Sequence, residues 1–146
     1  MKRGFTLLEL IIVVMIIGVL ATLGFATYGR LIEGARGAEA RDVIGAMRKM
    51  AIAYYIKYNS NLGGLIDADV GIGSPGIPTA CAGTHFFSYT YTPKPVPAGT
   101  TGLTFKASRC GAGGKIPNAT AAVPDAVTLT TDLATGIDTW ANVSPY

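Results

Sequence analysis

Apolar residues dominate the start of the chain, where Phe5–Phe25 carries one acidic or basic side chain, that of Glu9. The run is 21 residues long, and a helix needs about 20 apolar residues to cross a hydrocarbon core of roughly 30 Å. The residues are apolar on all sides of the predicted helix, as expected where no side faces water. The pattern therefore predicts a membrane-spanning helix over residues 5–30.

Beyond this run the pattern becomes amphipathic and stays helical to about Tyr58. Apolar residues recur at spacings of three and four, which places them on one helix face; they are Leu31, Ala35, Ala38, Ile44, Met47, Ala51, Tyr54 and Tyr58. We therefore expect one rod on the order of 80 Å long, at 1.5 Å per residue. Its second half, residues 31–58, is predicted to pack on a separate head.

From Asn59 onward the periodicity is that of strands. A long stretch rich in Gly and Pro reads as a connecting loop. Four segments then alternate between apolar and polar residues, and their predicted inward residues are Phe87, Tyr89, Tyr91, Leu103, Phe105, Ala107, Val127 and Leu129. Residues 59–146 are thus predicted to form a small antiparallel sheet of three or four strands. The expected fold class is α+β.

Charge adds little to this picture. The formal net charge is +3, and the basic residues gather between Arg30 and Lys57. A solvated helix face explains them better than a nucleic-acid site, so no specific nucleic-acid partner is predicted. Arg36, Glu39 and Asp42 stand at helical spacings, which predicts weak exposed ion pairs.

The two cysteines, Cys81 and Cys110, both lie in the predicted head. They belong to no CxxC pair and to no His/Cys cluster, so no metal site is predicted. An exported domain with two cysteines most simply forms one disulfide. We therefore expect a Cys81–Cys110 bond that stabilises the head.

Three interpretations compete for residues 1–25. A cleaved secretory signal usually has an apolar region of about 7–15 residues, which is shorter than this one. A plain signal anchor, oriented by Lys2 and Arg3, leaves Glu9 unexplained. In the third, the letters KRG followed by FTLLE resemble the class III signal of type IV pilins and pseudopilins, in which a basic leader ends in Gly and an aromatic residue is followed four residues later by Glu.

The resemblance implies a processing site and an assembly site. Residues 1–4 would be the leader, a prepilin peptidase would cut between Gly4 and Phe5, and the new amino group of Phe5 would be methylated. An acid in hydrocarbon costs several kcal/mol and marks a functional position. The resemblance implies that Glu9 pairs with the amine of Phe5 in a neighbouring subunit; the alternative is that Glu9 only reaches the membrane interface.

The resemblance also implies the ladle outline of a pilin and a structural function. The chain would be a type IV pilus subunit that polymerises with copies of itself, using an inner-membrane platform and a cytoplasmic ATPase. It would lie in the bacterial inner membrane before assembly and in an extracellular pilus afterwards, serving adhesion, twitching motility or DNA uptake. The alternatives are a pseudopilin or minor pilin of a type II secretion system, or a monomeric membrane-anchored binding protein. Pilins often have Pro where this chain has Ala26, which keeps the first alternative open, whereas Tyr28 and the expected disulfide favour a pilin.

No residue pattern in the head predicts catalysis. His85, the one histidine, has no Cys, Ser or carboxylate at a recognisable motif spacing. The aspartates do not form an ordered Ca²⁺ ligand loop; they are Asp67, Asp69, Asp125, Asp132 and Asp138. We therefore predict no enzyme activity, no cofactor and no metal.

Overall fold

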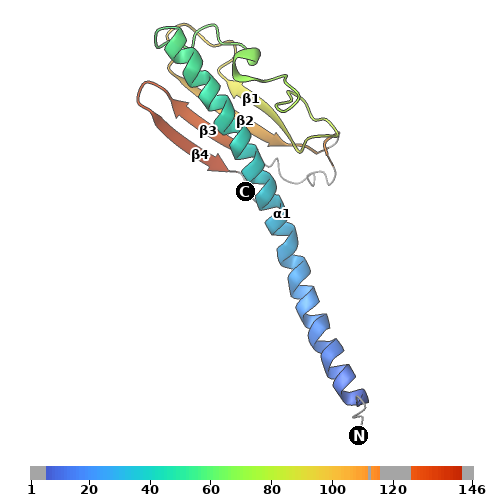
Figure 1. Ribbon diagram of the computed structural model, residues 1–146. Helices are drawn as coiled ribbons and strands as arrows, with labels where there is room; N and C mark the ends of the chain where they lie inside the picture. The colour runs from blue at the N-terminus through green and yellow to red at the C-terminus, as the bar shows by residue number, and fades with distance from the viewer. Residues whose placement is uncertain (1–5, 112, 116–125, 143–146) are drawn as a thin grey trace.

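The computed structural model describes residues 6–111, 113–115 and 126–142. Its elements are α1 (Leu7–Lys57), the 3₁₀ helix η1 (Asp67–Val70), β1 (Phe87–Thr92), β2 (Gly102–Arg109), β3 (Ala126–Asp132) and β4 (Ile137–Asn142). The head packs against one half of α1, and the other half projects alone (Figure 1). The predicted α+β ladle outline is confirmed.

The long helix has defined ends. It begins after the N-cap Thr6 and runs for 51 residues, which is on the order of 77 Å at 1.5 Å per residue. It ends at the C-cap Tyr58, because Asn59 and Ser60 take positive φ angles of 55° and 63°, a backbone region that a helix cannot use. The predicted rod over residues 5–58 is therefore confirmed to within two residues at each end.

The four strands form one antiparallel sheet in the order β1-β2-β3-β4. The register places Tyr91 opposite Phe105, Phe105 opposite Leu129, and Leu129 opposite Trp140. These four residues make one cross-strand row, called here the Tyr91–Trp140 row. Because side chains alternate between the faces of a strand, all four lie on the same face of the sheet.

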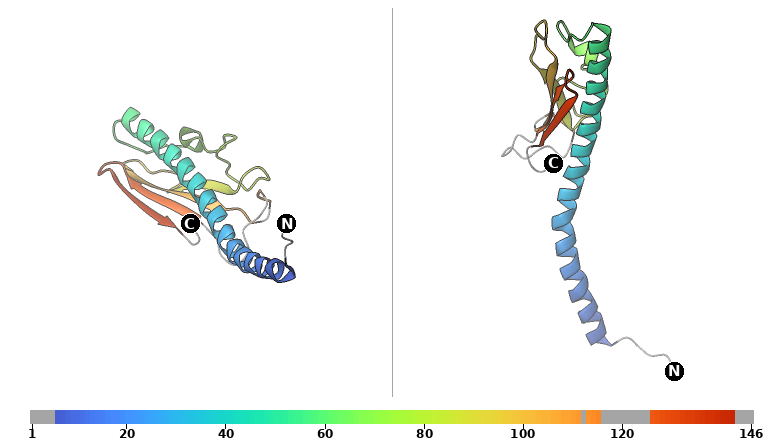
Figure 2. Two further views of the ribbon diagram at one scale, coloured as in Figure 1. Left: turned by 60° about the horizontal axis from the view of Figure 1, so that its bottom comes forward. Right: turned by 90° about the vertical axis from the view of Figure 1, so that its left-hand side faces the viewer.

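Helix and sheet pack as two layers, which the edge-on view shows (Figure 2). The second half of α1 lies across β2 and β3, while β4 lies beyond the helix at one edge of the sheet. The core between the layers is apolar, and its largest fully buried side chains include Ile44, Met47, Leu62, Phe87, Tyr91, Leu103, Phe105, Val127 and Leu129. The inward alternation predicted for the first three strands is therefore confirmed.

The helix face that packs on the sheet differs in part from the predicted one. The buried helix residues are Gly37, Ala40, Ile44, Met47 and Ala51. Leu31 is 70% exposed, because it precedes the first contact between helix and head. Ala35 and Ala38 are exposed as well, since at 100° per residue they lie on the other side of the helix from Ala40. The prediction was right for Ile44, Met47 and Ala51 and wrong for Leu31, Ala35 and Ala38.

The Gly- and Pro-rich connection contributes to the core. It buries Leu62, Leu65, Val70, Ile72 and Ile77. The carbonyl of Pro78 accepts a hydrogen bond of 2.9 Å from the Tyr89 amide of β1, so the connection covers part of the β1 edge. Its end is held by the disulfide between Cys81 and Cys110, which are 29 residues apart. The predicted disulfide is confirmed.

Candidate functional site

The projecting half of α1 exposes an apolar surface on every side. Each large apolar side chain from Leu7 to Phe25 is at least 46% exposed. By length and composition, α1 can cross a membrane. An exposed apolar surface of this extent is normally covered by lipid or protein. The projecting half is therefore the surface through which this chain contacts a bilayer or other helices.

Glu9 caps the helix at the start of this surface. The Thr6 amide donates to Glu9 Oε2 over 2.9 Å, and the Thr6 hydroxyl donates to the same oxygen over 2.8 Å. In return the Glu9 amide donates to Thr6 Oγ1 over 3.3 Å. This reciprocal pair is a capping box, which satisfies amides that have no partner within the helix. A carboxylate here also interacts favourably with the helix dipole.

The capping role was missed by our reading of the sequence, although the signal was present. Thr followed three residues later by Glu, directly before an apolar run, is the pattern of a capping box. The bonds donated by Thr6 both use Oε2, and Oε1 accepts none of the bonds found between described residues. Gly4 and Phe5 of the predicted cleavage site, and with Phe5 the predicted partner of Glu9, lie outside the described residues. The pairing of Glu9 with a neighbouring amine therefore stays a prediction.

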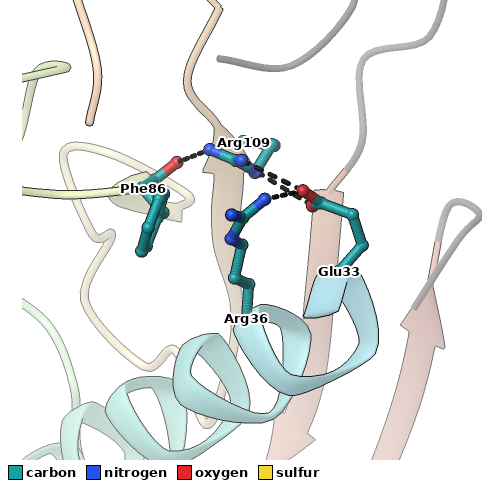
Figure 3. Close-up of polar contacts among 4 residues, drawn as sticks. All are labelled: Glu33, Arg36, Phe86 and Arg109. Carbon is teal, nitrogen blue, oxygen red and sulfur yellow. Dashed lines mark hydrogen bonds and ion pairs between the residues drawn. The ribbon is translucent and has the colours of Figure 1, made fainter. Parts of the chain in front are cut away.

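A buried ion-pair network joins the helix to the head (Figure 3). The Arg109 side chain is 0% exposed, and its Nε and Nη2 donate to the two oxygens of Glu33 over 3.3 Å each. Its Nη1 donates to the carbonyl of Phe86 over 3.1 Å. Arg36 pairs with the same carboxylate of Glu33. Glu33 of α1 thus binds Arg109 at the end of β2, and Arg109 in turn binds the segment before β1.

Charge and packing reinforce each other in this network. Arg36, Arg109 and Lys115 lie over the Phe86 ring, at 4.5, 4.9 and 4.8 Å from its centroid, and a cation over an aromatic face is attracted to it. A buried Arg is costly without its acid, so the network ties helix position to strand position. Arg36 was expected to pair with Glu39 or Asp42; the structure shows it paired with Glu33, which also binds Arg109.

The aspartates considered for Ca²⁺ serve the fold instead. Asp67 pairs with Lys94 over 2.6 Å, and Asp138 of β4 pairs with Arg48 of α1 over 2.8 Å. Asp132 accepts from the Ala134 amide and the Thr135 hydroxyl, each over 3.0 Å, and the amide followed by the hydroxyl lowers the pKa of its carboxyl. Asp125 lies outside the described residues, and within those residues no group of three potential metal ligands gathers.

His85 also has a local partner. Its Nδ1 lies 2.8 Å from the Thr84 hydroxyl, and its backbone carbonyl accepts from the Lys115 amide over 2.8 Å. These contacts hold the segment next to the disulfide. They give His85 a structural explanation, as the sequence suggested.

Comparison with known families agrees with this geometry. Residues 1–25 match the family described as the prokaryotic N-terminal methylation motif. A comparison of the chain with curated proteins finds no match. The motif is the class III signal peptide of type IV pilins, and together with the apolar helix and the α+β head it supports a type IV pilin or pseudopilin. The motif implies processing by a prepilin peptidase and fits membrane anchoring before assembly.

Proposed function

We propose that this protein is the structural subunit of a type IV pilus, which polymerises through the projecting half of α1. The observation that carries the proposal is that the methylation motif at residues 1–25 includes the start of a helix whose projecting half exposes its large apolar side chains. In the bilayer, lipid covers these side chains. In a filament, the same side chains of neighbouring copies cover one another. The protein would therefore act by assembly and not by catalysis.

The proposed subunit divides into four parts. Residues 1–4 are the leader, and residues 5–30 span the membrane and later form the filament core. Residues 31–58 are the amphipathic half of the helix, which packs on the head, and residues 59–146 form the head. Apolar burial is similar in lipid and in a helix bundle, so it supplies little net driving force for leaving the membrane. Polymerisation would need the inner-membrane platform and cytoplasmic ATPase. Contacts that are head-to-tail and do not close give an open helical polymer.

Glu9 is the proposed registration point. Cleavage after Gly4 would expose the amine of Phe5, and methylation would leave it positively charged. A carboxylate buried without a cation is expensive, so a neighbour that places its Phe5 amine beside Glu9 is favoured over one in a shifted register. Both bonds donated by Thr6 use Oε2, so Oε1 can take this partner without loss of those bonds.

A pseudopilin or minor pilin of a type II secretion system is the second candidate. The observation that favours it is Ala26, since pilins often carry Pro at this place. Such a protein would share the motif, the projecting helix and the use of Glu9. It would differ in forming a short or rare polymer instead of an abundant surface fibre.

Purification of surface fibres tests the proposal. The full chain would be expressed in its bacterial host, and fibres sheared from the cells would be imaged by electron microscopy and analysed by mass spectrometry. We expect long fibres whose dominant protein begins at a methylated Phe5. A Gly4→Val chain should remain unprocessed and give no fibres. Fibres that contain this protein only in traces would favour the minor pilin or pseudopilin.

A further inference from the structure

One apolar row of the head is left incomplete at the β4 edge. In the Tyr91–Trp140 row, Tyr91 is 1% exposed and both Phe105 and Leu129 are 0% exposed, whereas Trp140 is 43% exposed. The difference arises because α1 lies across β2 and β3 (Figure 1) and contacts β4 through the Arg48–Asp138 ion pair. Ile137, also in β4, is 63% exposed. The β4 edge therefore presents a large aromatic side chain that its own chain covers only in part.

The opposite edge of the sheet carries a recess of about 640 Å³. Its apolar lining includes Leu65, Ile66, Ile72 and Tyr91, and its charged lining is the Asp67–Lys94 ion pair. Pockets that bind compact apolar groups are typically about 300–1,000 Å³ in volume. The recess is thus large enough to receive an aromatic side chain.

The two features lie at matching places on the head. Tyr91, in the wall of the recess, and Trp140 are the two ends of the same cross-strand row, so they are at one level of the sheet and on its helix-facing side. The strands β1 and β4 are the opposite edges of the sheet. If two copies with parallel helices stand side by side, the Trp140 of one faces the recess of the next.

We propose that Trp140 of one subunit enters the recess beside Tyr91 and Lys94 of the neighbouring subunit. This proposal rests on the proposed filament function and names a lateral contact within it. The contact joins two different surfaces of the chain, so it is heterologous and repeats from subunit to subunit without closing. It continues the apolar row from one head into the next.

The chemistry of the recess suits an indole. A tryptophan side chain buries roughly 150–250 Å² when it is covered. Lys94 Nζ already lies 5.5 Å from the Tyr91 ring centroid, so an indole stacked in this place would meet a cation, and tryptophan is the aromatic residue that attracts cations most strongly. Direct strand addition is less suited to this edge, because Pro78 already accepts the Tyr89 amide of β1.

The head contact would supply orientation that the projecting helix lacks. The side chains from Leu10 to Phe25 are apolar or small on all sides, and such helices pack on one another in many rotations. A single aromatic side chain in a single recess selects one rotation. The lateral contact therefore complements the axial register proposed for Glu9.

Disulfide crosslinking in intact filaments tests the contact. The full chain would carry Trp140→Cys with Ile66→Cys, since Ile66 is 60% exposed in the recess. Within one subunit, Trp140 lies in β4, whereas Ile66 lines the recess beside β1. These opposite edges of the sheet are three strand spacings or about 14 Å apart, too far for a disulfide. Mild oxidation of sheared filaments should therefore give a ladder of multimers on a non-reducing gel. The matched control pairs Ile66→Cys with Lys106→Cys, on the outer face of the central strand β2, and should give no ladder.

An arginine substitution provides a second measurement that does not need cysteines. Ile66→Arg places a charge where the neighbour's Trp140 would enter, at a site that is exposed in the free subunit. We expect about ten-fold less sheared filament, the change that a loss of about 1.4 kcal/mol per subunit produces. Thr130→Arg, exposed on the outer face of β3, is the control and should leave filament yield unchanged.

The outcomes separate this contact from the function on which it rests. If the wild-type chain forms filaments but filaments of the Trp140→Cys, Ile66→Cys chain give no ladder, the contact is overturned and the filament function stands. If the double-cysteine chain is not assembled, an Ile66→Arg chain with normal filament yield overturns the contact. A wild-type chain that forms no polymer overturns the filament function, and the contact falls with it.

Discussion

The two halves of α1 belong to one continuous helix but are stabilised in different ways. The projecting half has exposed apolar side chains on every side, and among described residues its polar contacts are local, such as the Thr6–Glu9 cap. The half in the head buries one narrow face and uses its charges in contacts with strands. The position of the first half therefore depends on the lipid or protein around it, whereas the position of the second half is fixed by contacts within the chain.

The boundary between the halves is the Glu33 network. Before it, the large apolar side chains of the helix are exposed and meet lipid or other helices. From Glu33 onward, Arg109, the core face and the Arg48–Asp138 pair fix the helix on the sheet. A filament subunit needs both properties, because the helix must change neighbours during assembly while the head keeps its shape.

The largest expected effect falls on the projecting half. Glu9→Ala should abolish filaments while leaving cleavage after Gly4 largely intact, because the proposed partner of the Phe5 amine is lost. The measurements are electron microscopy of sheared fibres and the size of the subunit on a blot. The head should be unaffected, so its melting temperature should stay unchanged.

A substitution of Thr6 separates the two roles of Glu9. Thr6→Ala removes the hydroxyl of the capping box, which costs about 1 kcal/mol at a helix N-terminus, but it keeps the carboxylate. We expect Thr6→Ala filaments to form. Loss of filaments in both variants would mean that the cap, and not the pairing between subunits, is what assembly requires. Normal filament yield from Glu9→Ala would refute the pairing itself.

The next effect belongs to the head alone. Cys81→Ser opens the disulfide that holds the connection to the end of β2. For a loop of 29 residues the chain-entropy treatment gives a loss of about 3–4 kcal/mol in the free energy of unfolding. Denaturant unfolding of the full chain in detergent, with and without reductant, measures it. Equal stability of wild-type protein in both conditions would contradict a stabilising role for the bond.

The third prediction concerns the boundary. Glu33→Ala leaves Arg109 buried without this acid, and we expect a loss of about 2–3 kcal/mol in the free energy of unfolding. Removing one partner of a buried ion pair costs about 3–5 kcal/mol. The expected loss is smaller because the Glu33 side chain is 27% exposed. Unfolding in denaturant checks this value. Lys49→Ala, an exposed charge on the same helix, is the matched control and should change stability little. An equal effect of both substitutions would show that the network holds nothing.

These predictions fall partly on features that the sequence showed and partly on features that it did not. The rod, the strands and the disulfide follow from periodicity and cysteine count, because each depends on nearby residues or on a single pair. The face of α1 was predicted only in part, since Ala35 and Ala38 fit a helical spacing as well as Ala40 does. The Glu33–Arg109 pair joins residues 76 positions apart, and no local pattern indicates such a pair.

A smaller effect is expected at high pH, again only in the head. Burial, followed by the charge of Glu39, raises the pKa of Tyr89 well above its ordinary value. Because the pKa of Tyr89 is higher in the folded state than in the unfolded state, its neutral form stabilises the fold fully below the unfolded pKa of about 10. As pH rises above that value, the free energy of unfolding falls by about 1.4 kcal/mol per pH unit. Tyr89→Phe cannot ionise, so its head should lose less stability between pH 10 and 11. Parallel pH curves for the two proteins would contradict this account.

The smallest effect is expected at Asp132, in the hairpin between β3 and β4. Hydrogen bonds from the Ala134 amide and the Thr135 hydroxyl lower the pKa of its carboxyl, so its contribution is present above the unfolded value of about 3.9 and is lost as pH falls through the folded value. Asp132→Asn should therefore melt slightly below wild type at pH 7 and at the same temperature near pH 2. Asp132 lies in the head, far along the chain from the projecting half, so filament yield at pH 7 should not change. A fall in filament yield would mean that assembly depends on the shape of this hairpin, which leads into the β4 edge that carries Trp140. The head would then take part in the contacts between subunits.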